Sequence, residues 1–92
     1  MWVYVVCYDV SDDHQRQRIA HILSRYGQRV QYSVFEIVLR SAAELESLCQ
    51  QLRAGMDEET DIRLYRLCAR CRQQSRDVQG ESIIDLPAVI IV

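Results

Sequence analysis

The stretch Trp2-Val-Tyr-Val-Val-Cys-Tyr8 is almost continuously apolar, is rich in aromatic and β-branched residues, and is followed directly by Asp9. A short run of this kind predicts a central β-strand that is buried on both of its faces. The carboxylate that ends the run is therefore expected to emerge at an edge of the sheet, where a ligand can reach it.

The residues after this strand predict a helix. Ser11, Asp12 or Asp13 supplies the N-cap, and Gly27 is placed to end the helix. Between these signals an apolar stripe recurs at helical spacing, and it consists of Ile19, Ile22, Leu23 and Tyr26.

A second strand and a second helix are expected next. Residues 30–39 form the strand, with a mostly apolar second half. The helix begins at Ser41, which fits a capping box together with Glu44, and Gly55 is placed to end it. Its buried stripe is formed by Leu45, Leu48, Cys49 and Leu52.

The last third of the chain reads as strands joined by an exposed connection. Residues 62–71 predict a third strand, and a change of apolar phase between Leu64 and Leu67 suggests a bulge within it. Residues 72–82 look like an exposed connection, and residues 83–92 supply one or two short strands.

This order predicts an α+β domain of the ferredoxin-like type, a βαββαβ antiparallel sheet with both helices on one face and an extra C-terminal strand. The length of 92 residues is that of a single domain, residues 1–92. The helices would cover one face of the sheet, yet the first strand, and the second from Val34 onward, are apolar on both sides. Because large apolar patches mark interaction sites, we expect a homodimer packed sheet to sheet, sharing segment 83–92 with the partner protomer.

The charged residues are segregated along the chain. The formal net charge is −2, and every one of the 11 basic residues is an arginine. Residues 14–35 and 62–76 carry arginines and no carboxylate, whereas acidic residues concentrate in 41–61 and at both ends. Guanidinium groups bind phosphate well, so these stretches can present basic patches to a polyanion. GC-rich codon usage and ordinary solvated faces explain the same composition, so charge alone does not identify a nucleic-acid-binding protein.

The apolar runs are far shorter than the ~20 residues of a membrane-spanning helix, and no basic segment precedes one at the N-terminus, so we expect a cytoplasmic protein without a membrane partner. Its four cysteines are then expected to be reduced. Cys68 and Cys71 have the spacing of half a zinc site or of a redox pair, but no second pair completes four ligands. On a strand their side chains would point to opposite faces. We interpret them as small packing residues rather than as metal or redox groups.

Asp9 is the candidate for chemistry. Asp12 and Asp13 follow closely and either help to bind a hard cation or only cap the helix. One carboxylate per chain makes a poor magnesium site, but two Asp9 side chains related by a dimer axis would be adequate, because Mg²⁺ keeps several waters. Such an ion could act on a phosphodiester. The sequence contains no Gly-rich phosphate loop and no HExxH motif.

These residues also carry a family resemblance. The run Tyr8-Asp9-Val10-Ser11-Asp12-Asp13, the pair Arg16 and Arg18, and the run Tyr26-Gly-Gln-Arg-Val-Gln-Tyr-Ser-Val-Phe-Glu36 resemble Cas2, the small CRISPR-associated adaptation protein. The strong match covers residues 3–39, and weaker agreement continues through residues 62–65 and the apolar tail.

The resemblance implies a ferredoxin-like homodimer in which Asp9 of both protomers faces across the dimer axis and a divalent metal, Mg²⁺, is shared between them. Members of this family are described as metal-dependent nucleases of RNA or of double-stranded DNA, or as adaptors that hold the integrase Cas1 on incoming DNA. Asp9 is then the catalytic and metal-binding residue. The family positions linked to nucleic-acid contact fall on Tyr8, Arg16, Arg18, Arg29, Ser33 and Phe35.

Two functions follow as hypotheses. The first is a homodimeric adaptor in spacer acquisition, which bridges the integrase on duplex DNA. The second is a magnesium-dependent endonuclease acting on single-stranded RNA or on DNA. With one aspartate per protomer and no clear general base, the sequence favours the adaptor as the cellular role. The alternative is a generic ferredoxin-like interaction module for nucleic acid or protein without catalysis.

Overall fold

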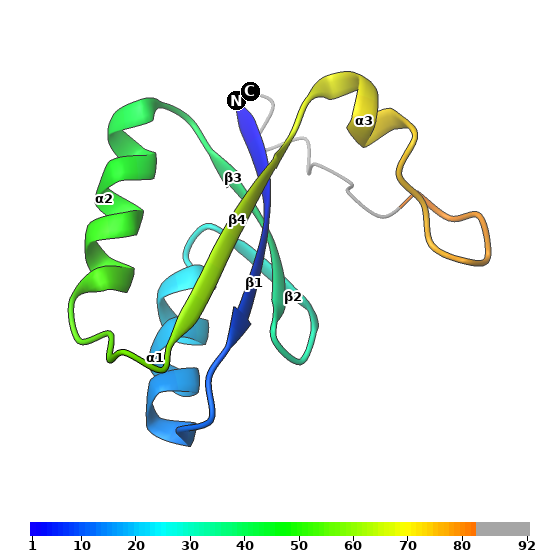
Figure 1. Ribbon diagram of the computed structural model, residues 1–92. Helices are drawn as coiled ribbons and strands as arrows, with labels where there is room; N and C mark the ends of the chain where they lie inside the picture. Colours follow the sequence, from blue (N-terminus) through cyan, green and yellow to red (C-terminus); the bar gives the residue numbers. More distant parts are fainter. Residues whose placement is uncertain (83–92) are drawn as a thin grey trace.

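The computed structural model describes residues 1–82, which form an antiparallel sheet of four strands in the order β2-β3-β1-β4 (Figure 1). The elements in chain order are β1 (Trp2–Asp9), α1 (Asp13–Leu23), β2 (Gly27–Gln31), β3 (Val34–Leu39), α2 (Ala42–Arg53), β4 (Asp61–Leu67) and α3 (Ala69–Gln73). The predicted α+β fold and its βαββαβ order are thus confirmed. The strands expected in residues 83–92 lie outside the described residues.

Strand β1 is central, as its continuous apolar run predicts. It pairs with β3 on one side and with β4 on the other, so both of its edges are used. Tyr4, Val6 and Tyr8 belong to the main core, whereas Val5 and Cys7 alternate with them and lie half-buried on the opposite face.

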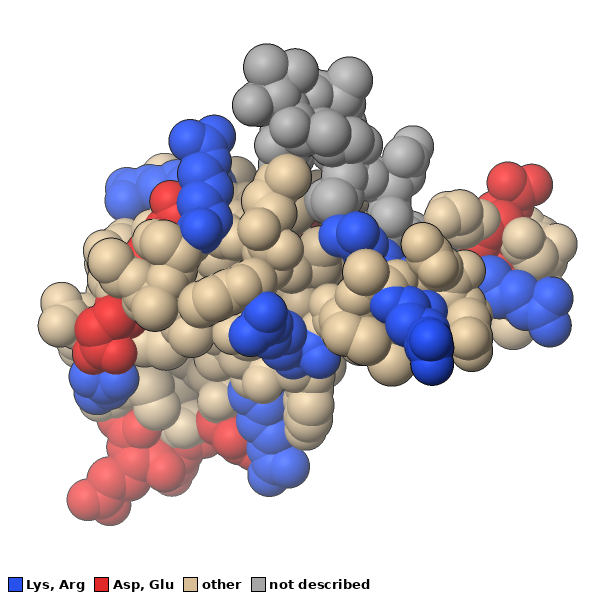
Figure 2. All heavy atoms as spheres, turned by 90° about the horizontal axis from the view of Figure 1, so that it is seen from above, with Lys and Arg blue, Asp and Glu red and all other residues tan. Residues whose placement is uncertain are grey.

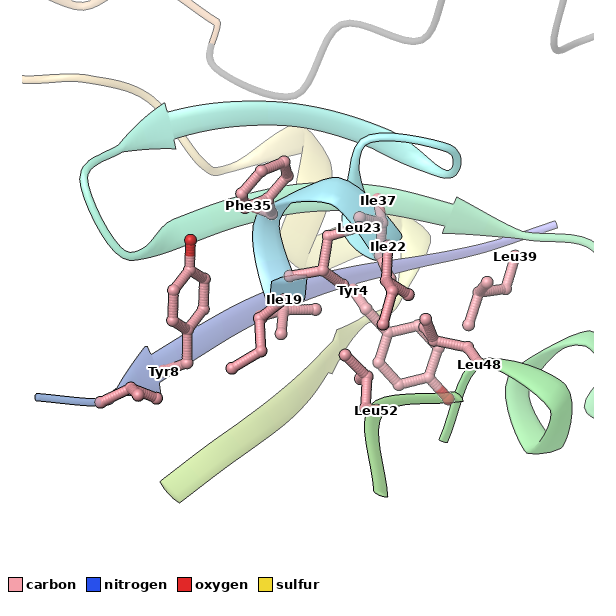
Figure 3. Packing of buried hydrophobic residues seen from close by; sticks show 12 residues of the cluster. Tyr4, Tyr8, Ile19, Ile22, Leu23, Phe35, Ile37, Leu39, Leu48 and Leu52 are labelled. Carbon is pink, nitrogen blue, oxygen red and sulfur yellow. The ribbon is translucent and has the colours of Figure 1, made fainter. Parts of the chain in front are cut away.

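Helices α1 and α2 cover the same face of the sheet (Figure 1). Figure 3 shows how their apolar stripes meet the strands: Leu23 of α1 lies beside Ile37 of β3, and Leu48 and Leu52 of α2 lie beside Tyr4 of β1. Ile19, Leu23, Ile37, Leu48 and Leu52 are at most 3% exposed, so they form the centre of the core. Each helix begins at a predicted cap.

Asp12 caps α1 by accepting from the backbone N–H of His14, and Ser41 caps α2 by accepting from that of Glu44 at 3.1 Å. The Glu44 carboxylate accepts from the backbone N–H of Arg40. These bonds satisfy N–H groups that a helix start otherwise leaves unpaired.

The prediction of one strand over residues 30–39 is wrong, because a hairpin occupies this stretch. Strand β2 begins at Gly27, the chain turns at residues 32–33, and β3 follows, with a bulge between Arg29 and Gln31. Gly27 also does not end α1, which stops at Leu23. Its backbone instead lies so close to β3 that a Cβ would sit 1.9 Å from the carbonyl oxygen of Glu36.

The third predicted strand is shorter than expected, and its bulge is absent. Strand β4 pairs with β1 without a register shift and ends at Leu67. The change of apolar phase has a different cause, because the chain leaves the sheet there and enters α3. Cys68 and Cys71 are therefore on a helical turn and exposed, which contradicts their interpretation as packing residues. The exposed connection is confirmed for residues 74–82, and the end of α3 occupies residues 72–73.

The sheet face opposite α1 and α2 is called here the open face. Val5, Val34 and Val38 lie half-buried on it, and Tyr65 is 51% exposed there. Glu36 stands among these side chains, opposite Val5, and partial burial raises the pKa of its carboxyl group. An apolar surface around a desolvated carboxylate fits the predicted sheet-to-sheet homodimer, which stays a prediction. No helix among residues 1–82 is both long enough and apolar enough to cross a membrane.

Candidate nucleic-acid and metal interface

The carboxylate at the end of β1 has a partner on the neighbouring strand. Asp9 and Asp61 are directly opposite each other in the antiparallel pairing of β1 with β4, and both are exposed. Directly opposed side chains share one face with Cβ atoms about 5 Å apart. Asp61 in turn accepts from Nε of Arg63 at 3.1 Å, which offsets part of the repulsion between the carboxylates. We call Asp9 and Asp61 the carboxylate pair.

Sequence reasoning missed Asp61. It was placed among the acidic residues of 41–61, and no local pattern shows that it meets Asp9. The strand register brings them together, and the only available signal was that Asp61 directly precedes the expected third strand.

The carboxylate pair fits a magnesium ion better than a lone aspartate does, because its oxygens are the ligand type that Mg²⁺ prefers. Residues 1–82 contain no group of three or more histidine, cysteine or acidic side chains able to hold a metal. A magnesium ion accepts one or two protein carboxylates and keeps several waters, so a pair is sufficient. Asp12 and Asp13 are engaged elsewhere, as the cap of α1 and in an ion pair with Arg16.

A second group of residues gathers where α1 approaches the β2–β3 hairpin. A shallow cavity of about 200 Å³ is lined by Asp13, Arg16, Gln17, Arg29 and Tyr32, and we call it the arginine–tyrosine pocket. The guanidinium of Arg16 lies 5.2 Å from the ring centre of Tyr32 and donates to its hydroxyl at 3.0 Å. Tyr32 is 67% exposed, so its ring is accessible for stacking.

Arg16 connects this pocket with the loop after β1. Its second terminal nitrogen donates to the carbonyl oxygens of Val10 at 3.1 Å and of Ser11 at 3.3 Å. The guanidinium is thereby held in place, and only 16% of the Arg16 side chain is exposed. Arg29 reaches the pocket from β2 and lies 5.6 Å above the ring of Phe35. The pocket therefore combines a fixed cation with an exposed one.

The residues that the family resemblance points to do not all gather in one place. Arg16 and Arg29 line the pocket, and Ser33 lies half-buried in the hairpin turn beside it. Tyr8 and Phe35 are core residues, 5% and 3% exposed, with ring centres 6.3 Å apart. Phe35 lies beneath Arg29, and any direct contact of Tyr8 or Phe35 with nucleic acid stays a prediction. Within the described residues, the Tyr8 hydroxyl is buried without a hydrogen-bond partner.

Sequence reasoning did not select Tyr32 or Gln17. Tyr32 was included among the polar members of a continuous strand. Only the turn between β2 and β3 places it beside Arg16, sixteen positions earlier in the chain.

Arg18 lies apart from the pocket and joins the two helices. Its guanidinium donates to the carbonyl oxygens of Gln51 at 3.1 Å and of Leu52 at 3.0 Å, which are among the last carbonyls of α2. Its Nε donates to Gln15 at 3.1 Å, and Gln15 donates to the carbonyl of Gly55. A cation at a helix C-terminus is favourable, so these contacts stabilise the fold.

We expect Arg18→Met to lower the free energy of unfolding by about 2 kcal/mol, because three charge-assisted hydrogen bonds are lost. Urea denaturation checks this. Arg25→Met is the matched control, since Arg25 is exposed and makes one long hydrogen bond to Gln51. Unchanged stability of Arg18→Met together with weaker nucleic-acid binding would contradict the structural role and favour direct contact.

A further set of arginines follows the end of the sheet. Arg63 lies on the open face beside Asp61, and Arg66 lies 4.3 Å above the ring of Trp2. Arg70, Arg72 and Arg76 belong to α3 and the connection after it. Seen from above, arginine side chains are spread over this surface, while acidic side chains are visible mainly at the lower left and at the right-hand end (Figure 2). We call Arg63, Arg66, Arg70, Arg72 and Arg76 the distal arginines.

Comparisons with known proteins agree on one family. The model of the family described as CRISPR associated protein Cas2 matches residues 1–75. A CRISPR-associated endoribonuclease Cas2 from Synechocystis is 41% identical over 88 residues, which cover 95% of this chain and 94% of that relative.

Two solved structures are similar as well. A chain of a partial Cas6-RT-Cas1–Cas2 complex is 33% identical with a TM-score of 0.80, and the match covers 94% of this chain and 100% of that one. Streptococcus pyogenes Cas2 at pH 6.5 is 29% identical with a TM-score of 0.73, over 83% of this chain and 98% of that one. The structural likeness therefore extends over most of the sequence.

Proposed function

The chain belongs to the Cas2 family of CRISPR-associated proteins, and on this premise we propose that it serves spacer acquisition as a homodimeric adaptor that bridges the integrase Cas1 on duplex DNA. The observation that carries the proposal is the open face, where half-buried valines surround a desolvated Glu36. A second copy of the chain would cover this apolar surface. The whole chain, residues 1–92, then acts as one domain within the dimer.

The partnership with the integrase rests on the similar chain found in a complex whose name includes Cas1. Residues 83–92 are the segment we assign to contact with the partner protomer. We propose that the protein acts in the cytoplasm, where the CRISPR array lies.

The arginines would hold the DNA by its phosphates. The arginine–tyrosine pocket is built by α1 and the β2–β3 hairpin, and the distal arginines belong to β4, α3 and the connection after it. Together they supply several guanidinium groups at the surface. Contacts of this kind read the backbone and not the base sequence, which suits an adaptor that must accept spacers of any sequence. Tyr32 adds a face on which an unpaired base can stack.

A magnesium-dependent endonuclease activity is the second function that a specific observation favours. Asp9 of each protomer would hold one Mg²⁺ ion that the two chains share at the dimer axis, and Asp61 would add negative charge beside it. When bound, such an ion neutralises charge on a phosphodiester and lowers the pKa of a bound water. Arg29, the exposed cation of the pocket, would bind a flanking phosphate and orient the strand, while Arg16 would hold Tyr32 and the loop after β1 in place. The substrate would be single-stranded RNA or duplex DNA; the name endoribonuclease of the Synechocystis relative supports RNA as the class of substrate.

We expect duplex DNA binding to weaken steeply with salt, because phosphate contacts release counterions. Fluorescence anisotropy over a salt series measures this. Replacing Arg63, Arg70 and Arg72 by glutamine should lower the affinity and reduce the slope of log K against log salt by about one for each lost contact. Arg53→Gln, at the end of α2, is the control and should leave the slope unchanged. An affinity for duplex DNA that changes neither with salt nor with the triple substitution would refute the adaptor function.

A further inference from the structure

Two cysteines that lie among the distal arginines contact each other. Cys68 is the N-cap of α3, and the backbone N–H of Cys71 donates to its Sγ at 3.4 Å. Both side chains are exposed, whereas Cys7 and Cys49 are half-buried. The chain therefore presents one pair of adjacent, accessible thiols, and neither the adaptor nor the nuclease function uses it.

The two thiols are chemically unequal. The hydrogen bond from the backbone N–H of Cys71, followed by the contact between the two thiols, lowers the pKa of Cys68. The same contact raises the pKa of Cys71, because its proton is shared with the Cys68 sulfur. Cys68 is thus the group that ionises first, and the thiolate is the form that attacks a disulfide.

The charges near the pair in the sequence favour an anionic reagent. Arg66, Arg70 and Arg72 lie in the same stretch of the chain, and the first turn of α3 contains no acidic residue. Positive charge of this kind attracts an anion such as oxidised glutathione.

The local geometry allows a bond between the sulfurs. Sγ of the N-cap residue Cys68 lies over the first turn of α3, 3.4 Å from the backbone nitrogen of Cys71, and a disulfide needs Cβ atoms about 4 Å apart. A small shift towards this distance is inexpensive here, since α3 has no buried residue and carries no part of the core.

We propose that Cys68 and Cys71 form a thiol–disulfide exchange site that closes an internal disulfide by reaction with a low-molecular-weight disulfide such as oxidised glutathione. The Cys68 thiolate attacks one sulfur of the small disulfide, forms a mixed disulfide and releases one small thiolate. Cys71 then loses its proton to solvent and attacks Sγ of Cys68, which releases the second small thiolate. Two protein thiols are oxidised, and the small disulfide is reduced to two thiols.

The test uses the reduced full-length protein and oxidised glutathione, with products identified by intact and peptide mass spectrometry. The wild type should lose two hydrogens and hold a Cys68–Cys71 disulfide. Cys71→Ser should instead gain one glutathione on Cys68, because no thiol is left to displace it. Cys49→Ser is the control and should form the internal disulfide as the wild type does.

Limited alkylation of the reduced wild type near pH 7 gives a second measurement. Cys68 should react about threefold faster than Cys71 or more, since a lower pKa raises the thiolate fraction more than it reduces nucleophilicity. Separate glutathione adducts on both cysteines without an internal disulfide would overturn the proposal. Faster alkylation of Cys71 would overturn it as well. Neither result depends on the proposed DNA or nuclease function.

Discussion

Replacing Asp9 by asparagine is expected to lower metal-dependent cleavage of RNA or DNA by about a hundredfold or more while leaving the dimer intact. Asparagine has nearly the same shape, but it removes one negative charge and one of the two carboxylate oxygens. Asp9 is exposed at the end of β1, so the change leaves the core untouched. Cleavage of labelled single-stranded RNA and duplex DNA, with Mg²⁺ or with EDTA, measures the effect.

Asp12→Asn is the matched control for this experiment. It makes the same chemical change three positions later, and asparagine caps a helix as well as aspartate does. The control should therefore cut like the wild type. The cleavage rate of Asp61→Asn should lie between those of Asp9→Asn and Asp12→Asn, because Asp61 also contacts Arg63 and is only half of the carboxylate pair.

Metal binding can be measured without any cleavage. A ligand that binds only the folded protein raises the melting temperature, so Mg²⁺ should stabilise the wild type and Asp12→Asn but not Asp9→Asn. If Asp9→Asn cuts as fast as the wild type, Asp9 is not catalytic. The adaptor would then be the whole function, and measured activity would come from a contaminating nuclease.

The elements that were predicted correctly are those with a local cause. The β1 run is central because it is apolar throughout, although Val5 and Cys7 are only half-buried on the open face. Helices α1 and α2 begin where Asp12 and Ser41 satisfy the first N–H groups of each helix. Each of these signals lies within a few neighbouring residues. A single sequence therefore contains enough information to place them.

The hairpin was missed because its turn carries only a weak signal, the single residue Ser33. Tyr32 and Ser33 replace the glycine, asparagine or proline that typically marks a reversal between strands. The glycine that matters stands five residues before the turn, at Gly27, and it was interpreted as the end of α1. Glycine is required at this position because the backbone of Gly27 lies against β3. This contact exists only once β2 and β3 have paired, so the local sequence does not indicate it.

The site was only partly predictable for the same reason. Asp9 could be selected from its position at a strand end, but Asp61 becomes its partner through the register of β1 with β4. Arg16 could be selected from the resemblance, but its contact with Tyr32 depends on the hairpin. Arg18 matches the family in type, yet its contacts with α2 arise from helix packing that no local pattern reveals.

The contact at Gly27 leads to the largest expected effect on stability. Gly27→Ala should lower the free energy of unfolding by about 3 kcal/mol, because the new Cβ would lie 1.9 Å from the carbonyl oxygen of Glu36 and 2.6 Å from Cα of Ile37. Both neighbours are backbone atoms of β3, so no side chain can rotate away. For a domain of this size the melting temperature should fall by roughly 15 °C.

Gly80→Ala separates this steric effect from the general cost of replacing a glycine. Gly80 has a φ of +93° but no atom within 4 Å of a new Cβ, and it lies in an exposed turn. Gly80→Ala should lower the free energy of unfolding by about 1 kcal/mol, from backbone strain alone. Equal losses for the two variants, measured by urea denaturation, would show that the close approach of β2 to β3 is not what requires glycine.

The same substitution links the fold to the proposed interface. If β2 separates from β3, Arg29 and Tyr32 leave the pocket while Asp9 keeps its place at the end of β1. Folded Gly27→Ala, assayed well below its melting temperature, should therefore bind single-stranded RNA about tenfold more weakly, because one phosphate contact and one stacking face are lost. Its stabilisation by Mg²⁺ should persist. Loss of both properties together would mean that the hairpin and the carboxylate pair form one cooperative unit.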